Sequence, residues 1–167
     1  MNKTKRLLIL DFDETLSNTN LFNKFGDNLD SFNDAWGNNL IEFQQTHFND
    51  FDNMKALFVD LVNNHYKICV VSFGYQKMIN RFIELSYGYD LIEKDNIVGT
   101  NGFNDQSKYD ITKNRKNNII SHFIKKYNVL NKNVIFIDDD NTNIIAVKNY
   151  FYPPIIAINI QKGNLIP

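Results

Sequence analysis

Acidic and polar side chains follow three short apolar runs of this sequence. They are Asp11, Asp13 and Thr15 after residues 7–10, Ser72 after residues 68–71, and Asp138, Asp139 and Asn143 after residues 134–137. A carboxylate at the end of a core strand is costly to bury unless it binds a cation or hydrogen-bond donors. Several oxygen ligands without a cluster of His or Cys favour magnesium over zinc. The pattern therefore predicts a divalent metal site.

The apolar runs are predicted to be strands of one parallel sheet. Three are strong, at residues 7–11, 68–72 and 134–138; a fourth is expected at 155–158 and a weak fifth near 97–99. Continuous apolar runs, rather than alternating ones, are expected where helices cover both faces of a sheet. Ligands of such sheets bind beyond the carboxyl ends of the strands. The polar residues that end these strands should therefore converge on one crevice.

Helical patterns lie between the predicted strands. Apolar residues recur at three-and-four spacing in residues 54–64, 76–87 and 117–127, and more briefly in 143–150. Strands that alternate with helices imply right-handed crossovers and a doubly wound, mainly parallel α/β sheet with a Rossmann-like arrangement. The sequence contains no internal repeat and no linker, so residues 1–167 are expected to form one domain.

Residues 17–53 have a different character, because aromatic side chains stand among polar ones without a strand-like run. The aromatic residues are Phe22, Phe25, Phe32, Trp36, Phe43, Phe48 and Phe51. One interpretation is a helical insertion, a small cap or flap, whose aromatic residues cover the sheet. The alternative is that part of it overhangs the site and contacts substrate. The residues expected nearest the site are Asn18, Asn20, Leu21 and Phe22.

Composition bounds the class of protein. The 167 residues have a mass of 19.6 kDa, the size of one ordinary domain. Hydrophobic residues make up 43% and charged residues 22%, which argues against wholesale disorder. Eighteen Lys and Arg against 19 Asp and Glu give a net charge of −1, which argues against a strongly basic nucleic-acid-binding surface.

The single cysteine and the N-terminal residues bear on location. Cys69 cannot form an internal disulfide, and its apolar neighbours predict a buried, inert thiol. The four apolar residues 7–10 are too few for a signal-peptide core, and no later run approaches the length of a membrane span. We expect a soluble, intracellular, cytoplasmic protein. His47, His65 and His122 are isolated in sequence and are interpreted as surface or packing residues.

In the order and strand context of its motifs, the sequence resembles the haloacid dehalogenase (HAD) superfamily of phosphotransferases. Asp11-Phe12-Asp13-Glu14-Thr15 resembles motif one, Ser72 motif two, and Asp138-Asp139-x-x-x-Asn143 motif four. Motif three is a lysine upstream of motif four, for which Lys108, Lys113 and Lys116 compete. Lys116 best matches the spacing of the magnesium-dependent phosphatase branch. The opening Asp-x-Asp-Glu-Thr-Leu is also similar to RNA polymerase C-terminal-domain phosphatases, and the acidic pair with Asn occurs in both branches.

The resemblance implies a role for each residue of motif one. Asp11 would attack phosphorus and form an aspartyl-phosphate, which divides hydrolysis into two easier steps. Asp13 would protonate the leaving oxygen and then activate water. Thr15 would orient Asp13.

The other motifs would bind phosphate and metal. Ser72 and the amides of Phe73 and Gly74 would hold the phosphoryl oxygens, and Lys116 would offset the charge of the phosphate and the nucleophile. The implied cofactor is Mg²⁺. Its ligands would be Asp11, the carbonyl of Asp13 and Asp139, with Asp138 or Asn143 supporting these ligands or sharing ligation.

The implied substrate is a phosphomonoester, on a phosphoprotein, another macromolecule or a small molecule. The second insertion point of the family corresponds to residues 74–113, which are largely accounted for by a helix and the weak strand. No large separate cap is therefore expected, and an open site admits macromolecular phosphate or a small substrate without a lid. The sequence does not determine the oligomeric state.

Three alternatives compete with this reading. A nucleic-acid 3′-phosphatase would use the basic residues Lys113, Arg115, Lys116, Lys125, Lys126 and Lys132, although a solvated helix face also explains them. A receiver domain shares the sheet, the acidic residues and a lysine, but places its acidic pair first and its lysine near the end. An inactive member would serve as a binding module, although every motif position carries a competent residue.

Overall fold

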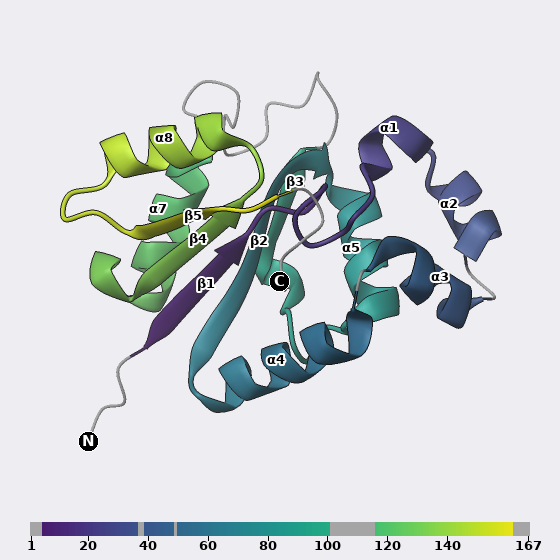
Figure 1. The fold of residues 1–167 in the computed structure, drawn as a ribbon, viewed down its shortest axis with the longest axis horizontal. Helices are drawn as coiled ribbons and strands as arrows, with labels where there is room; N and C mark the ends of the chain where they lie inside the picture. The colour runs from purple at the N-terminus through teal and green to yellow at the C-terminus, as the bar shows by residue number, and fades with distance from the viewer. Residues whose placement is uncertain (1–4, 37–38, 49, 101–115, 162–167) are drawn as a thin grey trace.

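The computed structural model describes residues 5–36, 39–48, 50–100 and 116–161. Its centre is a five-stranded sheet in which all neighbouring strands are parallel (Figure 1). The strands are β1 (Arg6–Leu10), β2 (Tyr66–Tyr75), β3 (Ile97–Thr100), β4 (Val134–Asp138) and β5 (Ile156–Asn159). All five predicted strands are present, including the weak one.

The order of the strands is β3-β2-β1-β4-β5. The central strand β1 therefore pairs with β2 on one side and β4 on the other, with Leu10 opposite Val70 and Ile137. This is the doubly wound order 3-2-1-4-5, whereas receiver domains have the order 2-1-3-4-5. The receiver alternative is therefore wrong for this chain.

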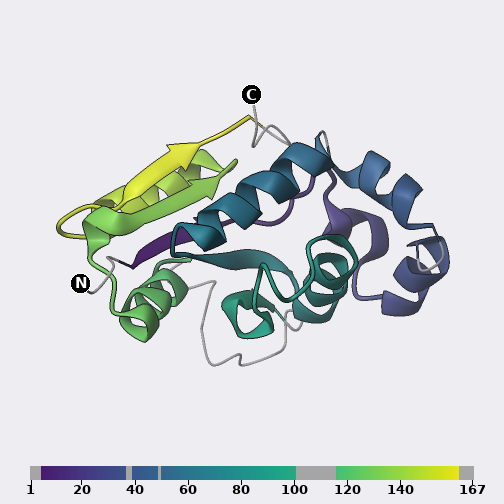
Figure 2. The ribbon, with the colours of Figure 1, turned by 90° about the horizontal axis from the view of Figure 1, so that it is seen from below.

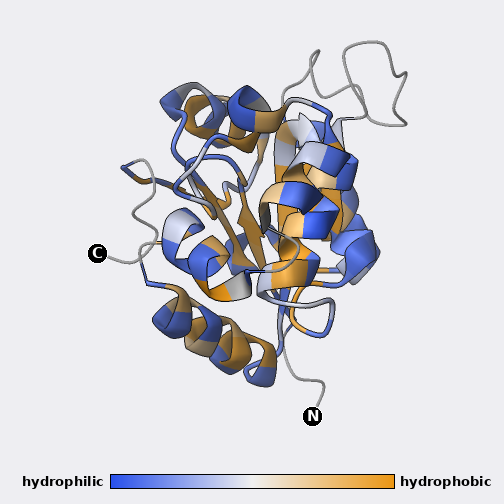
Figure 3. Ribbon diagram, turned by 90° about the vertical axis from the view of Figure 1, so that its right-hand side faces the viewer, coloured by the Kyte–Doolittle hydropathy of each residue, from blue (hydrophilic) through white to orange (hydrophobic). Residues whose placement is uncertain are grey.

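Helices cover both faces of the sheet (Figure 2). The main ones are α4 (Phe51–Asn63), α5 (Gln76–Ser86), α7 (Asn117–Tyr127) and α8 (Asn141–Tyr150), and short 3₁₀ turns precede β3 and β4 (Lys94–Asn96 and Asn131–Asn133). Leu8 and Leu10 of β1 pack with residues of α4 and α5, whereas Leu7 and Ile9 pack with α7 and α8. Successive residues of a strand point to opposite faces, so one continuous apolar run serves two cores. In Figure 3 the central strands are orange and the surrounding helices mix orange with blue.

Strand β2 is longer than its apolar run predicts. It continues through Ser72 to Tyr75, and its pairing with β3 shifts register between Val71 and Tyr75. Gly99 of β3 permits this close approach, because a Cβ at that position would lie 2.6 Å from the carbonyl oxygen of Gly74. The residues of motif two therefore belong to the extended end of a strand.

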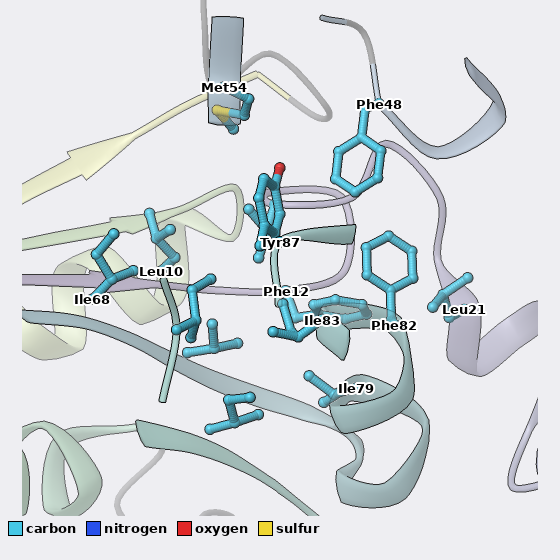
Figure 4. Close-up of a cluster of buried hydrophobic side chains, with 14 of the residues drawn as sticks. Leu10, Phe12, Leu21, Phe48, Met54, Ile68, Ile79, Phe82, Ile83 and Tyr87 are labelled. Carbon is cyan, nitrogen blue, oxygen red and sulfur yellow. The ribbon is translucent and has the colours of Figure 1, made fainter. Parts of the chain in front are cut away.

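The segment 17–53 contains three short helices before α4 begins. They are α1 (Leu21–Phe25), α2 (Leu29–Trp36) and α3 (Leu40–His47). The rings of Phe43 and Phe48 lie 4.9 and 5.3 Å from that of Phe82 in α5, and Phe82 also lies 4.8 Å from Phe12 of motif one. Figure 4 shows the ring of Phe82 next to that of Phe48 in this cluster. These aromatic residues therefore join the segment to the core; the side chains of Phe22 and Trp36 lie outside the described part.

Other expectations can be compared with the structure directly. Cys69 is buried, and burial raises the pKa of its thiol well above the ordinary value, as an inert thiol requires. His47 is fully buried, whereas His65 is exposed. Among the described residues, every helix is too short or too polar to cross a lipid bilayer.

Candidate active site

Asp11 stands directly after the central strand, where the ladder to β4 ends. Its amide donates to the carbonyl of Ile137 over 2.9 Å, and the residue is 8% exposed. The Nζ of Lys116 lies 2.5 Å from Oδ1 of Asp11 and 2.8 Å from Oδ2 of Asp138. One buried lysine therefore joins the carboxyl ends of β1 and β4.

Lys116 occupies this position because α7 begins at the next residue. Its side chain is 1% exposed, so burial opposes its positive charge, but the carboxylates of Asp11 and Asp138 outweigh burial and raise its pKa. Of the three lysines considered for motif three, Lys116 is the one that the structure describes. Lys108 and Lys113 lie outside the described residues.

Asp138 is surrounded by hydrogen-bond donors. The side-chain amide of Asn143 donates to its Oδ1 and Oδ2 at 3.2 and 3.1 Å, and the backbone amide of Asp140 donates to Oδ1 at 2.8 Å. The Nζ of Lys116 also donates a hydrogen bond to Oδ2 of Asp138. A fully buried carboxylate with these partners is suited to holding Lys116 and the start of α8.

Thr15 binds Asp139. Its Oγ1 donates to Oδ1 of Asp139 over 3.2 Å and accepts from the amide of Asp139 over 3.1 Å. We expected Thr15 to orient Asp13, but its hydroxyl is engaged with Asp139. The reason is the turn after β1, in which the amides of Leu16 and Ser17 both donate to the carbonyl of Phe12 at 3.0 Å and bring the chain back toward β4.

Asp11, Asp138 and Asp139 form a compact acidic cluster. Each offers a carboxylate oxygen, and these oxygens lie within 4.8 Å of one another. Burial raises the pKa of Asp11 to about 7 against the lowering effect of Lys116, and burial also raises the pKa of Asp139. When all three are ionised, Lys116 offsets only one of three negative charges. A divalent cation with oxygen ligands would offset the rest, so the donor set fits Mg²⁺.

Asp13 lies against motif two. Its Oδ1 accepts from the amide of Leu21 over 2.7 Å, at the start of α1. A Cβ built on Gly74 would lie 2.9 Å from Oδ2 of Asp13 and 3.3 Å from Oγ of Ser72. A side chain at position 74 would therefore displace both groups, which is a physical reason for glycine there.

Motif two forms the end of β2 beside the lysine. The Oγ of Ser72 accepts from the amide of Gly74 over 2.9 Å, and Thr100 Oγ1 donates to the carbonyls of Phe73 and Gly74 at 2.9 and 3.3 Å. The Phe73 ring centroid lies 5.3 Å from Nζ of Lys116, a cation–π distance, and this residue is 40% exposed. Phe73 therefore links motif two to the acidic cluster.

The site residues predicted from the sequence fall into two groups in space. Asp11, Lys116, Asp138, Asp139, Thr15 and Asn143 are joined by direct contacts, and Asp13, Ser72 and Gly74 form the neighbouring group. Two contributors were missed, Thr100 and Asn159, which hold the backbone of motifs two and four. Both stand at the carboxyl end of an edge strand. Because ligands of parallel sheets bind beyond these ends, the position of the two residues could have indicated them.

Among the described residues, Lys125 and Lys126 do not form one surface with Lys116. Lys125 and Lys126 lie in the last turn of α7, about 12 and 14 Å along the helix from its first residue at about 1.5 Å per residue. Lys126 donates to Oδ1 of Asn96 over 2.9 Å. Lys113 and Arg115 lie outside the described residues. The described lysines therefore give no support to a nucleic-acid surface at the site.

Comparisons with known proteins give different answers for sequence and structure. No protein-family model matches the chain, and a search of curated proteins gives no significant match. The HAD domain of effector protein Lem4 from Legionella pneumophila is similar in structure, with a TM-score of 0.63 and 17% identity over 98% of this chain and 90% of that one.

Two further structures are similar over most of this chain. The N-terminal part of BF1531 from Bacteroides fragilis, described as containing a phosphatase domain complexed with Mg, has a TM-score of 0.65 and 17% identity over 99% of this chain and 39% of that one. A substrate-bound phosphoserine phosphatase has a TM-score of 0.62 and 15% identity over 96% of each chain. At such identities the likeness is one of fold, and the chain has the Rossmann-like α/β fold of these HAD domains.

Proposed function

We propose that this chain, which has the fold of HAD phosphatase domains, is a magnesium-dependent phosphomonoester hydrolase. One observation carries the proposal. The carboxylate of Asp11 stands at the end of the central strand, 2.5 Å from a fully buried lysine and within a cluster of two further carboxylates. Burying so much charge is costly, and a site that binds a dianionic phosphate and a divalent cation gives it a use.

Asp11 is the proposed nucleophile. Lys116 contacts its Oδ1, so Oδ2 is assigned to the attack on phosphorus. A bond forms between Oδ2 and phosphorus while the bond to the leaving oxygen breaks, which gives an aspartyl-phosphate. Water then attacks the same phosphorus, releases inorganic phosphate and regenerates the Asp11 carboxylate. Lys116 offsets negative charge in both steps.

Asp13 is the proposed general acid and base. In the first step its protonated carboxyl gives a proton to the leaving oxygen, and in the second it takes one from the attacking water. The Leu21 amide fixes one carboxylate oxygen, and the other lies beside Gly74 and Ser72. Ser72 and the backbone of motif two are the proposed contacts for the phosphoryl oxygens.

The acidic cluster is the proposed metal site. Asp11, Asp139 and the carbonyl of Asp13 would hold Mg²⁺, while Asp138 supports them through its bonds with Lys116 and Asn143. When bound, Mg²⁺ would stabilise negative charge on the phosphoryl oxygens. Thr15 would keep Asp139 in place as a ligand.

The substrate is proposed as a phosphate ester on a phosphoprotein, another macromolecule or a small molecule. Initial rates on phosphopeptides, sugar phosphates and 3′-phosphorylated oligonucleotides would separate these classes. A preference for the oligonucleotides would favour the nucleic-acid alternative, which the described lysines do not support. Absence of turnover in every class would favour a binding module.

The test of the central proposal uses the purified protein and an aryl phosphate, with Mg²⁺ or with EDTA. We expect turnover with Mg²⁺, loss of turnover with EDTA, and no turnover in Asp11→Asn. Asp90→Asn, at an exposed aspartate far along the chain, is the matched control and should behave as the wild type. Full activity of Asp11→Asn, or indifference to EDTA, would refute the mechanism.

A further inference from the structure

The side chain of Asn159 binds two consecutive carbonyl groups of motif four. Its Nδ2 donates to the carbonyl oxygen of Asp138 over 3.1 Å and to that of Asp139 over 2.9 Å. Asn159 is the last residue of β5 and stands opposite Asp138 in the ladder between β4 and β5. The next amide, of Ile160, also donates to the carbonyl of Asp138, over 3.2 Å. The edge strand therefore holds the chain where it leaves β4.

These bonds are separate from those that the sheet itself requires. The ladder between β4 and β5 uses backbone groups, whereas a side-chain amide offers two hydrogens, and Asn159 directs both at motif four. A strand-end asparagine without a further role could point both hydrogens to water. The two carbonyls that it binds lie in the peptide units immediately before and after the Cα of Asp139.

Asp139 is consequently held from two sides. Thr15 binds its amide and its Oδ1, while Asn159 binds its carbonyl oxygen. The backbone amide, one carboxylate oxygen and the carbonyl oxygen of Asp139 thus have partners from the turn after β1 and from the end of β5. Asp139 is only half-buried, so packing alone does not fix its side chain. Holding the backbone narrows the positions that the carboxylate of Asp139, which Thr15 also binds, can take beside Asp11 and Asp138.

We propose that Asn159 is a positioning residue for the metal ligand Asp139, so that β5 forms part of the metal site. The inference rests on the proposed function, which makes Asp139 a ligand. Asn159 touches neither the phosphate nor the cation; it acts through the backbone of motif four. Without it, Asp139 has more conformations to lose on binding, and partners of this kind typically change metal affinity by about 10–100-fold.

The test compares Asn159→Ala and Asn159→Leu with the wild type; Leu has a similar size but no donor. Asn149→Ala, an exposed asparagine near the end of α8, is the matched control, and Thr15→Val removes the hold from the other side. Calorimetry on the purified proteins measures the Kd for Mg²⁺. Urea unfolding without metal measures stability separately, and the Mg²⁺ concentration for half-maximal turnover is read beside kcat.

We expect both Asn159 variants to fold and to bind Mg²⁺ about 10–100-fold more weakly, with Thr15→Val similarly affected and Asn149→Ala unchanged. At saturating Mg²⁺, the loss of kcat in these variants should be smaller than their loss of affinity for Mg²⁺. Wild-type Mg²⁺ binding with affinity within twofold in both Asn159 variants would overturn the inference and leave the proposed function standing. A wild type that hydrolyses phosphate esters without binding Mg²⁺ would overturn the metal role itself.

Discussion

Lys116 and Asp138 form a fully buried ion pair, with 2.8 Å between Nζ and Oδ2 and side chains that are 1% and 0% exposed. The same Nζ lies 2.5 Å from Asp11, so the lysine ties the start of α7 to the ends of two neighbouring strands. Removing one member of a buried pair leaves an uncompensated charge, which costs more than the pair contributes. Stability and chemistry are therefore linked at one side chain.

The first prediction concerns this lysine. Lys116→Met should lower the free energy of unfolding by about 3–5 kcal/mol, because two buried carboxylates lose their cation. It should also cost about 2–4 kcal/mol of transition-state stabilisation, measured as kcat/KM at a temperature where the variant is folded. Lys125→Met, on the exposed side of the same helix, is the control. Lys108→Ala and Lys113→Ala should cost far less, and a larger loss at Lys113 would reassign motif three.

The second prediction separates the two carboxylates of motif one. Asp13→Asn should slow hydrolysis of an alkyl phosphate more than that of nitrophenyl phosphate, because an alkoxide needs a proton to leave and nitrophenolate does not. Asp11→Asn should abolish both. The measurement is kcat/KM for each ester in each variant. Equal losses on the two esters in Asp13→Asn would rule out its role as the general acid.

The third prediction is a pH dependence of stability. Burial, followed by the charge of Lys24, lowers the pKa of His47 to about 4 from 6.5. As the pH falls below about 6.5, His47 binds a proton in the unfolded chain, whereas in the folded chain it stays neutral until about pH 4. Folding stability should therefore decrease from pH 6.5 to pH 4, by up to about 3 kcal/mol at about 1.4 kcal/mol per pKa unit.

The contribution of His47 is isolated by substitution. Urea unfolding between pH 4.5 and 7.5 should show a shallower pH dependence for His47→Gln than for the wild type. The exposed His65 provides the matched control, and His65→Gln should keep the wild-type slope. His47 binds Thr19 and packs on Phe43, so its variant also reports how the segment 17–53 is attached. Parallel curves for all three proteins would contradict the prediction.

The fourth prediction distinguishes packing from substrate contact within the segment 17–53. Phe43→Ala should lower the free energy of unfolding by about 3–5 kcal/mol, because its ring is fully buried against Phe82. Phe22→Ala, close to motif one in the sequence, should instead change the ratio of kcat/KM for a phosphopeptide and a small ester. An unchanged ratio in a folded Phe22→Ala protein would leave that residue with packing alone.

The sequence by itself determined the elements and the reactive residue types. The limits of β4 and α7 agree with their apolar patterns residue for residue, because an apolar run or a three-and-four repeat is a local signal. The carboxylates of Asp11 and Asp138 were found for the same reason, since Asp11 directly follows β1 and Asp138 ends β4. Because the carboxyl ends of parallel strands meet at one edge of the sheet, Asp11 and Asp138 were then expected to lie together, without any knowledge of their contacts.

Only the tertiary structure decided how these residues pair. Thr15 binds Asp139 across 124 positions of sequence, and Asn159 reaches motif four from the edge strand. Lys116 lies between two carboxylates because α7 begins beside the ends of β1 and β4. Such pairings depend on the order and register of the strands and on turns between them. A local sequence pattern does not indicate strand order, register or the path of a turn, because the packing of whole elements determines all three.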